Sequence, residues 1–236
     1  KAFNILNKIG VQFWKIASGE IDNFEMISNM IKTKKKILLS TGMSSIEEIK
    51  SIVNFFKKKK FSNFVLMQCT TQYPVKFSQI GINILDYYRN NFKCEVGLSD
   101  HSGSPYPSIY AISKNSSVIE VHVTFDKSLF GPDIKSSINF DELKQIVEFR
   151  NAKNLMDDSS FSKNKISKKL KNYKYLFGRS LALKKNLNKG EELIASNLTL
   201  KKPGTGLNIK FKKKIIGRRA TKDLNYRKLL KLNDLK

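Results

Sequence analysis

The sequence predicts an α/β fold built from parallel βα units. Five short runs rich in Val, Ile, Leu and Phe occur in the first 156 residues, and they lack the strict alternation of half-exposed strands. Amphipathic helical patterns separate these runs, and one unit takes about 31 residues, which is the spacing of a (β/α)8 barrel. A doubly wound sheet is the structural alternative. No G-x-G-x-x-G sequence follows any of the runs, which disfavours that alternative.

The predicted strands and helices follow one another in a regular order. The strands cover 13–18 (FWKIAS), 37–41 (ILLST), 65–70 (VLMQCT), 96–101 (VGLSDH) and 118–125 (VIEVHVTF). The sequence SSIEE at 44–48 resembles a capping box and opens a helix whose apolar residues recur at helical spacing. A second clear helix covers 141–156. Five units fill 1–156, so we expect five of the eight units of a TIM-type barrel.

The last third of the chain differs in composition. Residues 157–175 are polar and lysine-rich, which indicates a linker or a solvated helix. Residues 176–236 form a small unit in which glycines separate short predicted strands. Leu187-Asn188 and Leu193 in its first half match Leu224-Asn225 and Leu230 in its second half. This weak repeat indicates a compact β-rich unit with pseudo-two-fold symmetry.

The formal charge of +24 suggests a nucleic-acid binder, but the composition argues against one. Only six of the 44 basic residues are arginine, the residue that reads and stacks on bases, so a lysine-rich solvated surface is favoured and no specific nucleic acid is expected. No apolar run reaches 18 residues, so no membrane span is expected. Two cysteines, Cys69 and Cys94, make no disulfide scaffold, and a reducing cytoplasm is the simplest location.

Polar residues gather at the carboxyl ends of the predicted strands, where the active site of a barrel lies. They are Lys15, Ser18, Glu20, Ser40, Thr41, Thr71, Tyr73, Ser99, Asp100, His101, Glu120 and His122. The chain has two histidines, and both end neighbouring strands, so His101 and His122 are predicted to share a divalent ion. Lys15 lies inside an apolar strand, and its ammonium is expected to meet an anion, although it could also reach solvent at the rim.

Several strings, in order along the chain, resemble the sialic acid synthase family. They are KIASGE (15–20), LLSTGMSSIEEI (38–49), QCTTQYP (68–74), GLSDHSG (97–103), EVHVTFD (120–126) and FGPD (130–133). The tail RSLALKKNLNKGEEL (179–193) with KKPGTG (201–206) is similar to the C-terminal antifreeze-like, or SAF, domain of that family. The resemblance covers nearly all 236 residues.

This resemblance implies a nonulosonic acid synthase that joins phosphoenolpyruvate to an N-acetylated hexose. N-acetylmannosamine would give N-acetylneuraminate and phosphate by C–O cleavage. The likeness makes His101 and His122 the manganese ligands, and these two with Lys15 the catalytic residues. It assigns phosphoenolpyruvate binding to Lys15, Ser18, Ser40, Thr71, Tyr73 and Ser99, and sugar contacts to Glu20 and Asp133. Mn²⁺ would polarise the sugar aldehyde for attack by carbon 3 of phosphoenolpyruvate.

The resemblance also implies a domain-swapped homodimer, in which position 202 reaches the sugar in the partner's site. Lys202 stands where the family usually has arginine. Lysine keeps the positive charge but lacks the planar guanidinium that donates two parallel hydrogen bonds. Three barrel units, roughly 90 residues, are expected upstream of this chain, and we expect residues 1–236 alone to be inactive.

Two other functions stay open. Legionaminate or pseudaminate synthase would use the same chemistry on a different acylated hexose. A non-catalytic carbohydrate-binding protein with a degenerate barrel belongs to another class.

Overall fold

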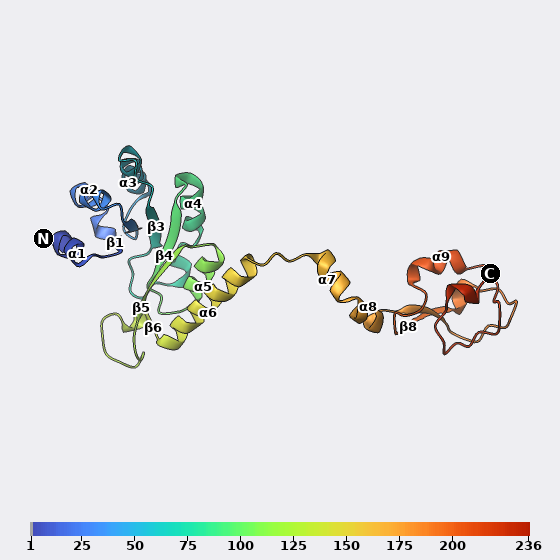
Figure 1. The fold of residues 1–236 in the computed structure, drawn as a ribbon. Helices are drawn as coiled ribbons and strands as arrows, with labels where there is room; N and C mark the ends of the chain where they lie inside the picture. The colour runs from blue at the N-terminus through green and yellow to red at the C-terminus, as the bar shows by residue number, and fades with distance from the viewer. Residues whose placement is uncertain (1) are drawn as a thin grey trace. The chain divides into compact units, whose positions relative to one another are not determined.

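The computed structural model describes residues 2–236, which form two compact units with the boundary between Ser159 and Ser160. The first unit is an α/β unit with a parallel sheet, and the second is smaller (Figure 1). No helix in residues 2–236 is long and apolar enough to cross a membrane. Cys69 and Cys94 are both free thiols.

The first unit is organised around six parallel strands that are hydrogen-bonded in chain order. They are β1 (Phe13–Ile16), β2 (Lys36–Ser40), β3 (Phe64–Cys69), β4 (Glu95–Asp100), β5 (Val118–Val123) and β6 (Ser137–Ile138). A doubly wound sheet reverses its strand order at a switch point, and this sheet does not, so the barrel-type arrangement holds. The predicted parallel α/β architecture is confirmed. The sixth strand was not predicted, because two residues carry no periodic signal.

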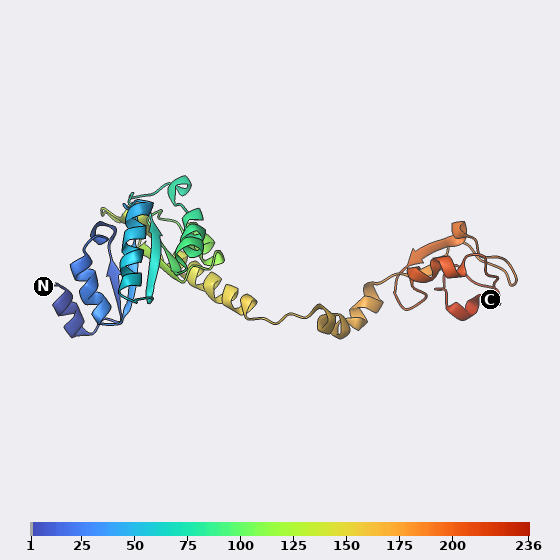
Figure 2. The same ribbon diagram turned by 90° about the horizontal axis from the view of Figure 1, so that it is seen from above.

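Helices precede, connect and follow the strands of this unit (Figure 2). They are α1 (Ala2–Ile9), α2 (Phe24–Lys32), α3 (Ile46–Lys58), α4 (Asn83–Phe92), α5 (Tyr106–Ser113) and α6 (Phe140–Asp157). Parallel crossovers are right-handed, so consecutive strand order places the connecting helices on one face of the sheet. The predicted capping box is present in α3, where Ser45 and Glu48 each accept a hydrogen bond from the other's backbone N–H.

The residues of each strand divide between the two faces of the sheet. Alternate strand residues pack against the helices in the main core, and we call this the outer face. From the strands the outer face takes Trp14, Ile16, Ile37, Leu39, Phe64, Leu66, Val96 and Leu98. The inner face has a small apolar cluster of Leu38, Val65 and Met67. Beyond this cluster, towards the carboxyl ends of the strands, the inner face becomes polar.

An ion pair shows that the sheet is strongly curled. Lys15 Nζ on β1 lies 3.1 Å from Glu120 Oε2 on β5, although three strands separate β1 from β5. Strands lie about 4.8 Å apart, so in a flat sheet these backbones would be roughly 19 Å apart, too far for the two side chains to meet. The inner face is therefore concave, as in a partial TIM-type barrel.

The second unit contains a two-stranded antiparallel sheet and three short α-helices. Its elements are α7 (Lys163–Lys169), α8 (Lys171–Phe177), β7 (Ser180–Leu183), β8 (Leu198–Lys201) and α9 (Lys212–Ile215). Leucines dominate its separate core. Leu187 and Leu224 exchange backbone hydrogen bonds of 3.0 and 2.8 Å in an isolated bridge, so the two segments of the sequence repeat meet there.

Leu66→Ala tests how much the central strand contributes to stability. Leu66 is fully buried on β3, so we expect the free energy of unfolding of the first unit to fall by about 2–5 kcal/mol in chemical denaturation. Leu155→Ala makes the same change at a side chain that is 75% exposed on α6, and we expect less than about 0.5 kcal/mol. Equal losses for the two variants would contradict this packing.

Candidate active site

A polar cavity of about 260 Å³ lies at the carboxyl ends of β1 to β5, on the concave inner face. Its lining consists of Lys15, Ala17, Ser18, Ser40, Cys69, Tyr73, Ser99, Asp100, His101, Glu120, Val121 and His122. Seven of the eleven residues to which the family resemblance gave a role are among them. The structure therefore brings together side chains that lie far apart in the sequence.

Lys15 and Glu120 form the charged part of this cavity. Lys15 was expected to meet an anion, and in the structure its ammonium pairs with the Glu120 carboxylate at 3.1 Å. The side chains are 29% and 42% exposed, so solvent screens the pair and its contribution to stability is small. The ammonium is therefore held at the cavity wall, where an incoming anion can also reach it.

Ser40 contributes a hydroxyl that lacks a partner. Its residue is 3% exposed, and its Oγ forms no hydrogen bond with any described residue. A buried hydroxyl without a partner costs roughly 1–3 kcal/mol. Ser99 is similarly buried and lies in register with Cys69 on the neighbouring strand. Such hydroxyls beside an ammonium fit an anionic ligand that would accept their hydrogen bonds.

Ser18, Thr71 and Cys69 surround the backbone of Gly42, which follows β2. The Gly42 N–H donates a hydrogen bond of 2.9 Å to Ser18 Oγ. Burial raises the pKa of the Cys69 thiol, and hydrogen bonds from Ser99 and Ser18 oppose this only in part. Cys69 is therefore a neutral thiol at physiological pH, and not a thiolate nucleophile.

The two histidines face each other on the inner face. His101 directly follows β4 and His122 lies on β5, and their ring centroids are 5.2 Å apart. Tyr73 packs against both rings, at centroid distances of 4.2 Å from His101 and 5.8 Å from His122. Burial raises the pKa of the Tyr73 hydroxyl, so it stays protonated and can donate a hydrogen bond.

Hydrogen bonds fix the orientation of His101. Its Nδ1 lies 3.1 Å from the carbonyl oxygen of Thr70, which can only accept, so this nitrogen carries the proton and donates. Its own carbonyl accepts a bond of 3.1 Å from Val75 N–H. The preceding Asp100 accepts bonds from the backbone and side chain of Ser102, while burial raises its carboxyl pKa.

The donor set of this cavity fits an open metal site. With Nδ1 of His101 protonated, its Nε2 keeps a free lone pair, which is the form of imidazole that binds metal ions. Within residues 2–236 no group of three or more His, Cys, Asp or Glu side chains could hold a metal ion. Two imidazoles would leave the remaining positions to substrate and water, unlike a closed structural site.

Four residues to which the family resemblance gave a role lie outside the cavity lining. Asp133 Oδ2 is 4.0 Å from His122 Nδ1, and Thr71 lies beside Gly42 at the rim. Glu20 is exposed and accepts a bond of 2.8 Å from Asn23 Nδ2. Lys202 belongs to the second unit, where its ammonium lies 5.8 Å from the ring centroid of Phe177.

The sequence placed Glu120 at the strand ends but gave it no role, and it left Cys69 out altogether, although both line the cavity. Glu120 had a usable signal, because it precedes His122 by two residues on one strand and so shares its face. The sequence carried no such signal for Cys69, since a cysteine at the end of an apolar strand cannot be told from a core residue by its pattern.

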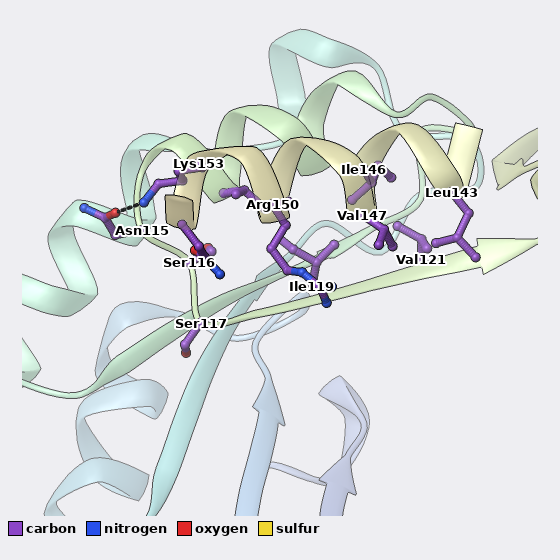
Figure 3. Close-up of a pocket in the computed structure, with 12 residues that line it drawn as sticks. Asn115, Ser116, Ser117, Ile119, Val121, Leu143, Ile146, Val147, Arg150 and Lys153 are labelled. Carbon is purple, nitrogen blue, oxygen red and sulfur yellow. Dashed lines mark hydrogen bonds between the residues drawn. The ribbon is translucent and has the colours of Figure 1, made fainter. Parts of the chain in front are cut away.

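A second cavity, of about 490 Å³, lies on the outer face between β5, α5 and α6. Figure 3 shows Leu143, Val147 and Arg150 of α6 directed towards Ile119 and Val121 of β5. These strand residues alternate with Glu120 and His122, so this cavity is on the opposite side of β5. None of the candidate site residues lines it, and we therefore assign the chemistry to the smaller polar cavity.

Comparisons with known proteins show which family the chain belongs to. A model of the NeuB family matches residues 1–160, and a SAF domain model matches residues 178–236. The chain is 34% identical to an N,N'-diacetyllegionaminic acid synthase of Campylobacter jejuni, over 98% of the chain and 69% of that protein. It is also 34% identical to a pseudaminic acid synthase of the same species, over 94% of the chain and 64% of that protein.

A solved structure extends the likeness. An N-acetylneuraminic acid synthetase from Leptospira borgpetersenii superposes with a TM-score of 0.63 at 27% identity, covering 72% of this chain and 60% of that one. The chain thus spans between three fifths and seven tenths of the length of these relatives. With matches in the same order along both units, the chain belongs to the NeuB family and carries a SAF domain.

Proposed function

We propose that the protein containing this chain is a nonulosonic acid synthase that condenses phosphoenolpyruvate with an N-acylated hexose. The observation that supports this most is the meeting of Lys15, the unpartnered Ser40 hydroxyl and the histidine pair in one concave cavity. Phosphoenolpyruvate carries a phosphate and a carboxylate, and it needs a cation with several donors around it.

Lys15, Ser40, Ser99 and Ser18 are proposed to bind the phosphoenolpyruvate anion. Lys15 supplies the positive charge, and the buried hydroxyls supply donors whose hydrogen bonds are unmade or weak in the free protein. Thr71 and Tyr73 would add donors at the rim. Glu120 holds the ammonium in place before the substrate arrives, and its carboxylate stays close enough to orient it afterwards.

His101 and His122 are proposed to bind one divalent ion, with Mn²⁺ expected. When bound, such an ion acts as a Lewis acid towards the aldehyde oxygen of the open-chain sugar. The Thr70 carbonyl holds His101 in the tautomer that this role requires, and Tyr73 restricts both rings by packing. Asp133 beside His122, with Glu20 at the rim, would contact the sugar.

Three products, each from a different acylated hexose, are compatible with the same phosphoenolpyruvate site. N-acetylneuraminate from N-acetylmannosamine is our first candidate, and legionaminate and pseudaminate are the others. The identities of 34% to synthases of the latter two compounds support including both. We further propose a homodimer in which Lys202 reaches the sugar of the partner's site. A carbohydrate-binding protein without activity is the alternative of another class.

Turnover by the full-length protein tests the proposed function. The protein is incubated with phosphoenolpyruvate, Mn²⁺ and each acylated hexose in turn, and phosphate release and the nonulosonic acid are measured by mass spectrometry. We expect one sugar to give equal amounts of both products. Saturable sugar binding without phosphate release from any of the three would favour the non-catalytic alternative.

Lys15→Met should raise the KM for phosphoenolpyruvate by at least about 10-fold and the KM for the sugar much less, because it removes the only charge proposed to bind the anion. Lys36→Met is the matched control, since Lys36 also pairs with a glutamate of the inner face, Glu95, at 2.6 Å. Lys36 begins β2, at the end of the strand away from the cavity, so we expect both KM values to change less than about 2-fold. Equal effects of Lys15→Met on both substrates would mean that Lys15 supports the fold or the sugar.

His101→Ala and His122→Ala should each weaken Mn²⁺ binding by at least about 10-fold, measured by calorimetry on protein stripped with EDTA. Turnover should fall in parallel with the Mn²⁺ affinity, while an unchanged far-UV circular dichroism spectrum shows that the fold is kept. Full Mn²⁺ affinity in both variants, or full activity in EDTA, would refute the metal site.

A further inference from the structure

Gly42 lies at a point where any side chain would collide with its neighbours unless they shifted. A Cβ added there would lie 2.8 Å from Cys69 Sγ and 3.0 Å from Ser18 Oγ, and it would be even closer to Thr71 Oγ1. The first two distances are at or below the shortest that real Cβ atoms show. The Gly42 backbone has no positive φ, so the constraint is space and not conformation.

We propose that Gly42 is a positioning residue that holds Ser18 as a hydrogen-bond donor to the bound anion. This inference rests on the proposed function of the cavity. The Gly42 N–H occupies one lone pair of Ser18 Oγ at 2.9 Å, and the missing side chain lets the loop backbone come this close.

The direction of this hydrogen bond determines what Ser18 can do. A hydroxyl has one donor hydrogen and two acceptor lone pairs, and an N–H can only donate. With Gly42 as donor, the Ser18 hydrogen stays available for another acceptor. The neighbouring candidate in the free protein is the Cys69 thiol, which is a weak acceptor. A phosphate or carboxylate oxygen makes a much stronger, charge-assisted bond and would take the hydrogen when it enters.

Gly42→Ala should therefore weaken phosphoenolpyruvate binding by about 10-fold or more, because the methyl group displaces Ser18 Oγ. The measurement is calorimetric titration of the full-length protein with phosphoenolpyruvate, with circular dichroism and thermal unfolding as folding checks. Gly19→Ala is the matched control. A Cβ at Gly19 would meet only the terminal Met43 Cε at 3.4 Å, an ordinary contact, so we expect less than a 2-fold change.

A double-mutant cycle separates positioning of Ser18 from general crowding. Ser18→Ala alone should lower the affinity for phosphoenolpyruvate about as much as Gly42→Ala does. Adding Gly42→Ala to the Ser18→Ala variant should then change this affinity by less than about 2-fold. Full additivity would overturn the inference, because Gly42 would then act through packing of Cys69 and Thr71. If Gly42→Ala does not fold, Ser18→Ala can still refute the inference, which does not survive an unchanged affinity for phosphoenolpyruvate in that variant. A wild-type protein that does not bind phosphoenolpyruvate would refute the proposed function itself, and this inference with it.

Discussion

The ion pair between Lys15 and Glu120 joins the first and fifth strands of a single sheet across its concave face. It can form only because six parallel strands in chain order curl strongly enough to bring their inner side chains together. The same curvature collects Ser40 and Ser99 in one cavity with the two histidines, which end neighbouring strands. The site is thus a consequence of the sheet's topology, and it would not exist on a flat sheet.

Because side chains alternate along each strand, one face of the sheet forms the stabilising core and the other carries the candidate site. On β5, Ile119 and Val121 face the helices, while Glu120 and His122 face the cavity. Leu66 and the other outer-face residues form the large core that fixes the strands. That core lets the inner face hold groups that cost stability, such as the unpartnered hydroxyl of Ser40.

The sequence was informative where local pattern decides structure. Strand–helix alternation predicted the parallel sheet, the SSIEE string predicted the start of α3, and polar residues after apolar runs located most of the cavity lining. Contacts between residues far apart in the chain could not be predicted from the sequence. That Glu120 would be the partner of Lys15 depends on the sheet's curvature, and the requirement for glycine at position 42 depends on three side chains from two other loops and one strand.

The most direct test of the proposed site is a crystal structure of the full-length protein with phosphoenolpyruvate and Mn²⁺. We predict that substrate oxygens lie within hydrogen-bond distance of Lys15 Nζ and Ser40 Oγ, with the metal ion between His101 and His122. Phosphoenolpyruvate bound outside this cavity, with Lys15 contacting only Glu120 and Ser40 still without a partner, would contradict the proposed site.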